Sequence, residues 1–135
     1  MYSILGRLFP VHPLAGIPQR IVFIRPCCIG DVVLATAALK ALRQAYPNAH
    51  ITWAVGGWSR RVVQNHPYID EILDTGSNAN PAAGFAGLWK FSRLLRQGNF
   101  DMAVSLVRSP WMSLAVYLSG IRDRVGLDSA GRGFG

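Results

Sequence analysis

The chain has 135 residues, of which half are hydrophobic and 16% are charged. This composition is that of one globular domain with its own core, and it excludes both a disordered chain and two ordinary domains. The net charge of +7 comes mostly from arginine, which favours bidentate contacts to phosphate and carboxylate. We therefore expect anionic partners such as a nucleotide, a phosphorylated lipid headgroup, a membrane surface or nucleic acid, the alternative being that the charge only aids solubility.

The first 19 residues predict a loose N-terminal extension, because Pro10, Pro13 and Pro18 interrupt their apolar run. Two adjacent cysteines follow, Cys27 and Cys28. A disulfide needs separated and correctly aimed Cβ atoms, so we expect both to be free thiols, interpreted first as small buried hydrophobes. Free thiols predict a reduced, cytoplasmic protein.

Short apolar runs alternate with segments of helical periodicity along the rest of the chain. Strands are predicted at 21–25, 51–55, 71–73, 102–107 and 124–127, and helices at 31–46, 59–65, 87–97 and 111–118. This alternation predicts the α/β class, with a Rossmann-like parallel sheet and helices on both faces. The glycine-rich residues 128–135 add no closing element, so the chain looks cut rather than finished.

The most informative segment is 25–31, with the sequence RPCCIGD, which joins the first strand to the first helix. It places Asp31 at the carboxyl edge of the sheet, where open α/β folds bind ligands. A negative charge there suits a general base better than a phosphate cradle. An alternative stays open for each of the two residues. Asp31 could serve only as the helix N-cap. Gly30 could serve only to make a tight turn that a Cβ would obstruct, instead of allowing a substrate to approach closely.

The pattern Ile-Arg-x-x-x-Ile-Gly-Asp-Val-Val-Leu at 24–34 resembles the opening of the ADP-heptose:lipopolysaccharide heptosyltransferases of glycosyltransferase family nine. Further landmarks resemble that family in the same order, namely ALRQAYP at 41–47, HPYIDEI at 66–72, FD at 100–101 and RVG at 124–126. The resemblance covers about residues 20–135. It implies the acceptor-side N-terminal domain of a GT-B glycosyltransferase, truncated and without its C-terminal donor-binding domain.

The family's activity is the inverting transfer of a heptose-like sugar from an ADP-sugar to a lipopolysaccharide-core or other cell-envelope saccharide. The resemblance assigns the catalytic base to Asp31. No Asp-x-Asp motif is present, so we expect no metal and no cofactor beyond the nucleotide sugar. The basic composition suits peripheral contact with the anionic inner face of the cytoplasmic membrane, and no nucleic acid is expected. A single truncated domain is expected to be inactive alone.

The other candidate substrate-binding residues are Arg25, Cys28, Gly30, Arg60 and Arg108. A structural ion pair is the alternative for Arg25, and a solvated helix face is the alternative for Arg60. Near the end of the fourth strand, where many relatives have an Asp, this chain has Ser105.

Two other functions compete with the glycosyltransferase hypothesis. One is a non-catalytic module that binds an anionic ligand or partner. The other is a nucleotide-binding α/β domain of another class, which the missing Gly-x-Gly-x-x-Gly pattern weakens.

Overall fold

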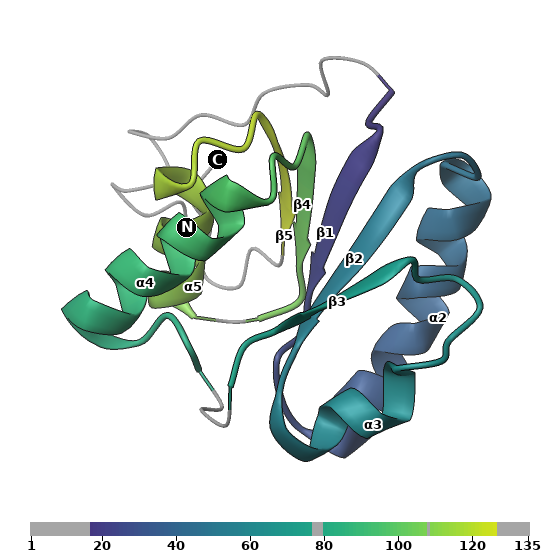
Figure 1. The fold of residues 1–135 in the computed structure, drawn as a ribbon, viewed down its shortest axis with the longest axis horizontal. Coiled ribbons are helices and arrows are strands. Elements are labelled where there is room, and N and C mark those ends of the chain that lie inside the picture. Colours follow the sequence, from purple (N-terminus) through teal and green to yellow (C-terminus); the bar gives the residue numbers. More distant parts are fainter. Residues whose placement is uncertain (1–16, 77–79, 108, 127–135) are drawn as a thin grey trace, which may run out of the picture.

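The computed structural model describes residues 17–76, 80–107 and 109–126, and Figure 1 shows a twisted central sheet with helices on both sides. Every strand pairing is parallel. The strands are β1 (Arg20–Ile24), β2 (His50–Val55), β3 (Glu71–Asp74), β4 (Met102–Ser105) and β5 (Asp123–Gly126). The helices are α2 (Ile29–Ala45), the 3-10 turn η1 (Gly57–Ser59), α3 (Arg60–Val63), α4 (Gly84–Gln97) and α5 (Pro110–Leu118).

The strand order is β3-β2-β1-β4-β5. The chain therefore builds outward from β1 through β2 to β3, then returns to the other side of β1 with β4 and β5. This reversal makes the gap between β1 and β4 a topological switch point, and ligands bind outside the carboxyl ends of the strands at such points.

Each face of the sheet has its own core. One contains Val22 and Ile24 of β1 with Leu88, Phe91 and Leu95 of α4, together with residues of α5. The other contains Ile21 and Phe23 with residues of α2 and α3. Because alternate side chains of a strand point to opposite faces, the apolar residues 21–24 of β1 supply both cores, as a buried central strand should.

The predicted α/β class and parallel Rossmann-like sheet are confirmed. The main errors concern boundaries. The first helix begins at Ile29 rather than at residue 31, the third at Gly84 rather than at 87, and β4 ends at Ser105 rather than at 107. Within the described residues, no helix is long and apolar enough to cross a bilayer.

Candidate functional site at the switch point

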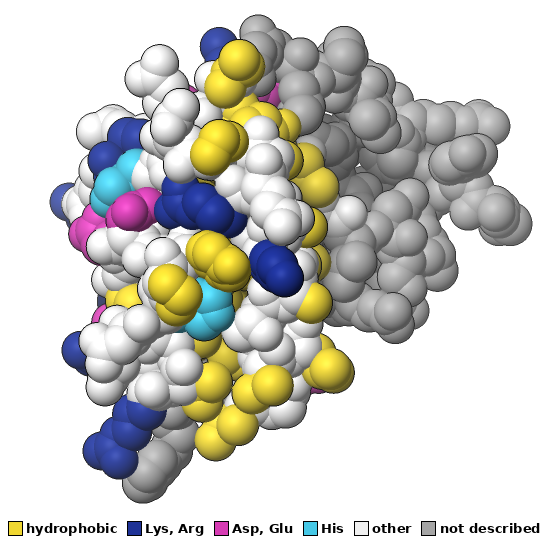
Figure 2. Space-filling view, turned by 90° about the vertical axis from the view of Figure 1, so that its right-hand side faces the viewer, with side chains coloured by type: hydrophobic (Ala, Val, Ile, Leu, Met, Phe, Trp, Pro, Cys, Tyr) yellow, Lys and Arg dark blue, Asp and Glu magenta, His cyan; other side chains and the backbone are white. Residues whose placement is uncertain are grey.

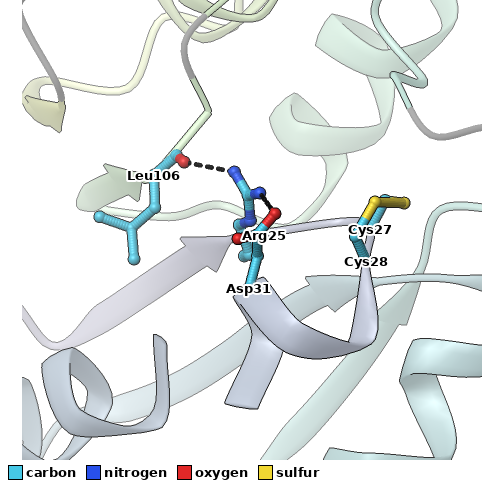
Figure 3. The surroundings of a disulfide bond; sticks show 5 residues. All are labelled: Arg25, Cys27, Cys28, Asp31 and Leu106. Carbon is cyan, nitrogen blue, oxygen red and sulfur yellow. Dashed lines mark hydrogen bonds and ion pairs between the residues drawn. A yellow bond between two sulfur atoms is a disulfide. The ribbon is translucent and has the colours of Figure 1, made fainter. Parts of the chain in front are cut away.

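Arg25 connects the two strands that border the switch point. It follows β1, and its Nη1 donates a 2.7 Å hydrogen bond to the backbone carbonyl of Leu106, the first residue after β4. Its Nη2 donates to Oδ2 of Asp31 and forms an ion pair with it (Figure 3). The structural ion pair that was the alternative for Arg25 is thus present, and one guanidinium fixes the position of a carboxylate against the carboxyl edge of the sheet.

Asp31 lies at the third residue of α2 and is not its N-cap. The N-cap residue is Cys28, which makes no side-chain capping hydrogen bond. The carboxylate of Asp31 is therefore not used to cap the helix, and its side chain is 54% exposed. With Oδ2 held by Arg25, Oδ1 has no hydrogen-bond partner among the described residues and is available to accept a proton.

Gly30 does not make the tight turn that the sequence suggested. It lies within the first turn of α2, and an added Cβ would meet nothing within 4 Å. The turn is made instead at Cys28, whose φ of 82° lies in the left-handed region. The open space over Gly30 leaves close approach of a ligand as its remaining functional interpretation.

The prediction of two free, buried thiols was wrong. Cys27 and Cys28 are joined by a disulfide, and Cys28 is exposed. Their Cα atoms are 3.6 Å apart, as expected for neighbouring residues, which is less than the Cα–Cα distance usual in disulfides between distant residues. Because the two cysteines are not free thiols, they do not support the prediction of a reduced, cytoplasmic protein. Figure 3 shows the sulfur atoms beside the Arg25–Asp31 pair but pointing away from it.

The edge of the site combines polar and apolar groups. Arg25 Nε and Ser105 Oγ are buried and have no hydrogen-bond partner among the described residues. On the outer side of Asp31, Val33 and Leu34 expose apolar surface, Leu34 to 76%. Figure 2 shows hydrophobic side chains scattered among basic ones over the α2 side of the molecule. A ligand with both hydroxyl and apolar parts suits such a surface.

Arg60 lies outside this group. It begins α3, where its Nη1 pairs with Asp74 Oδ2 at 2.9 Å, and it lines a shallow pocket of about 330 Å³ with Gln64 and Asp70. No contact joins that pocket to the Arg25–Asp31 pair within the described residues. Arg108, the last candidate, lies outside the residues that the structure describes.

Two contributors to the site were missed in the sequence. One is the carbonyl of Leu106, since any residue offers a carbonyl and only the strand order brings this one to Arg25. The other is buried Trp53 of β2, whose Nε1 donates a 3.2 Å hydrogen bond to the Arg25 carbonyl. A tryptophan inside an apolar strand was a possible signal, because a buried indole N–H usually finds an acceptor.

No group of three or more His, Cys, Asp or Glu side chains in the described part of the chain is placed to hold a metal ion. The arrangement at the switch point is instead a positioned carboxylate beside a positioned guanidinium. Such a pair can accept a proton from a hydroxyl group and hold an anionic group nearby.

The sheet order is that of a Rossmann-like α/β domain of the kind found in GT-B glycosyltransferases. A glycosyl transferase family 9 structure from Veillonella parvula DSM 2008 superposes with a TM-score of 0.69 and 26% identity, covering 81% of this chain and 32% of that one. The structure of E. coli ADP-heptose lps heptosyltransferase II superposes with a TM-score of 0.67 and 23% identity, covering 84% and 32%.

Lipopolysaccharide heptosyltransferase 2 of Escherichia coli K12 is 25% identical over 108 residues, which are 80% of this chain and 31% of that protein. No protein-family model matches the sequence. The chain is a relative of glycosyltransferase family 9 and of the lipopolysaccharide heptosyltransferases, and it spans about a third of the length of these relatives.

Proposed function

We propose that this chain is the acceptor-side domain of an inverting glycosyltransferase, with residues 1–19 as an extension and the nucleotide-sugar site on a separate domain. The sugar donor is an ADP-heptose-like nucleotide sugar, and the acceptor is a lipopolysaccharide-core or related envelope saccharide at the inner face of the cytoplasmic membrane. The likeness to heptosyltransferase 2 supports this chemistry. The observation that carries it is the exposed Asp31 carboxylate, held by Arg25 at the switch point.

In the proposed reaction, an acceptor hydroxyl oxygen attacks the anomeric carbon of the donor and forms the new glycosidic bond. The bond between that carbon and the diphosphate oxygen breaks, and ADP leaves with the bonding electrons. Asp31 Oδ1 takes the hydroxyl proton as the attack proceeds. Arg25 acts as a positioning residue, because it touches the carboxylate rather than the reacting atoms.

The test is sugar transfer from ADP-heptose to a lipopolysaccharide-core acceptor, measured on the longest open reading frame that contains this chain. Asp31→Asn keeps the shape of the side chain but removes the base, so transfer is expected to fall about 100-fold or more while acceptor binding persists. Glu71→Gln is the matched control, because Glu71 is equally exposed and lies at the amino end of β3. Full transfer by Asp31→Asn would show that the assignment is wrong.

The second candidate function is a non-catalytic module that binds an anionic saccharide. The observation that favours it is the net charge of +7, carried mostly by arginine, which suits an anionic ligand. A stop codon directly after Gly135, together with acceptor binding and no transfer, would select this function. An open frame that continues into a second Rossmann-like domain would select the transferase.

A further inference from the structure

The outward face of α4 combines exposed aromatic and basic side chains. At 100° per residue, its exposed side chains fall on an arc of about 140°, while Leu88, Phe91 and Leu95 point into the core. We call this surface the α4 face. Its members are Phe85, Trp89, Lys90, Arg93 and Arg96.

The aromatic part of the α4 face is unusually open to solvent. Phe85 is 85% exposed and Trp89 is 70% exposed. Phe85 is nevertheless ordered by an edge-to-face contact with Trp111 of α5, with ring centroids 5.7 Å apart. Two large aromatic side chains one helical turn apart cost free energy in water, and such an exposed apolar group marks an interaction site.

The charged part of the α4 face is purely cationic. From residue 75 to residue 122 the sequence has one acidic residue, Asp101. Asp101 accepts hydrogen bonds from the backbone N–H groups of Gln19 and Arg20 at the amino edge of the sheet, and within the described residues it forms no ion pair with a basic residue of this face. Neither Lys90 nor Arg93 has a carboxylate partner within the described residues, so their charge is available to an external anion.

The neighbouring end of α5 extends the same surface. Arg96 Nη2 donates a 2.7 Å hydrogen bond to the carbonyl of Leu118, and the Leu118 side chain is itself exposed. Beside it, the guanidinium of Arg124 lies 5.0 Å from the ring centre of Tyr117. Apolar and basic groups therefore lie side by side on α4, α5 and the start of β5.

We propose that the α4 face docks this domain onto a bilayer that contains anionic phospholipid. Aromatic rings favour the boundary between headgroups and acyl chains, while lysine and arginine reach the lipid phosphates. A protein partner would explain the aromatic residues, but a purely cationic surround fits the continuous negative charge of a phospholipid surface better.

The position of the α4 face agrees with this docking. A helix that connects parallel strands runs antiparallel to them, so Phe85 and Trp89 at the start of α4 lie toward the carboxyl edge of the sheet. The first turn of α2, which contains Asp31, lies at that same edge, and α2 covers the opposite side of the sheet from α4 (Figure 1). A bilayer in contact with α4 would thus approach the edge that holds the candidate site without covering it. This inference rests on the proposed function for the presence of a membrane and adds the surface that would contact it, and its test is independent of sugar transfer.

The test is co-sedimentation of the chain with vesicles of phosphatidylethanolamine and phosphatidylglycerol, compared with vesicles of phosphatidylcholine alone. We expect binding to the anionic vesicles only, weakened by added salt because surface electrostatic attraction is screened. Arg93→Glu and Trp89→Ser should each weaken the vesicle affinity about fivefold or more.

Two variants serve as matched controls. Lys40→Glu makes the same charge change as Arg93→Glu on an exposed position of α2, and Val62→Ser removes an exposed apolar side chain from α3. Both should bind like the wild type, as should Asp31→Asn, so a failed transfer assay leaves this result intact. Equal binding to both vesicle types, equal losses in the controls, or binding of a protein partner in place of vesicles would overturn the proposal.

Discussion

Arg25 and Leu106 are 81 residues apart in the sequence, yet the Arg25 side chain donates a hydrogen bond to the Leu106 carbonyl across the switch point. The contact joins the carboxyl ends of β1 and β4, which are separated in the sequence by two strands and several helices. The same guanidinium binds Asp31 at the start of α2. One side chain therefore connects three elements at the edge where a ligand would bind.

Removing this side chain should destabilise the domain. Arg25→Ala loses both hydrogen bonds, and we expect the free energy of unfolding to fall by about 1–3 kcal/mol. Urea denaturation measures this as a lower midpoint at an unchanged slope. Arg93→Ala is the control, because Arg93 is exposed and its loss should change stability by no more than about 0.5 kcal/mol. Equal midpoints for the two variants would contradict the role given to Arg25.

Helix α2 offers a second comparison, between two leucines with opposite surroundings. Leu39 is fully buried against β1 and β2, whereas Leu34 is 76% exposed. Leu39→Ala should cost about 2–5 kcal/mol, because it removes buried apolar surface and leaves a cavity. Leu34→Ala should cost less than about 0.5 kcal/mol. Thermal or urea denaturation checks both values, and similar losses would show that α2 packs with another face.

The parts of the structure that the sequence predicted are those fixed by local pattern. The apolar run before Arg25 predicted β1, and the spacing of Val32, Ala35 and Leu39 predicted the buried face of α2. Tertiary contacts fixed the rest. The hydrogen bond to Leu106 depends on strand order, and no periodicity reveals it.

The misplaced turn and the misplaced start of α2 have one local cause. The sequence placed the turn at Gly30, because glycine usually provides left-handed φ. The structure places it at Cys28, which forms the disulfide with Cys27, and α2 starts two residues earlier than predicted. Asp31 thereby moves from the cap into the first helical turn, where its carboxylate reaches Arg25 instead of the helix backbone.

The disulfide is directly measurable. The denatured chain should show no free thiol before treatment with a reductant and two afterwards, since Cys27 and Cys28 are the only cysteines. A colorimetric thiol assay gives this count, and Cys28→Ser, with one free thiol under both conditions, is the control. Two free thiols in the untreated chain would restore the prediction made from the sequence.

Asp70 links the start of β2 to the end of α2 and should make stability depend on pH. Its Oδ2 accepts 2.8 Å hydrogen bonds from the Ile51 N–H and from Arg43. Burial alone would raise the pKa of Asp70, but the Ile51 hydrogen bond, the Arg43 hydrogen bond and the charges of Arg43 and His50 outweigh it and lower the pKa. The ionised form is therefore favoured in the folded state.

Because the folded pKa of Asp70 lies below the unfolded value of about 3.9, its contribution is complete above about pH 4 and is lost as the pH falls through the folded pKa. The side chain is 44% exposed, so solvent screening keeps this contribution below about 1 kcal/mol. Asp70→Asn should thus melt lower than the wild type at neutral pH, and the difference should shrink in acid. Melting temperatures from pH 7 to pH 2 test this, with Glu71→Gln as a control that keeps the Asp70 contacts. A difference in melting temperature between the wild type and Asp70→Asn that stays constant with pH would mean that the stabilisation comes from side-chain shape rather than from the ionised carboxylate.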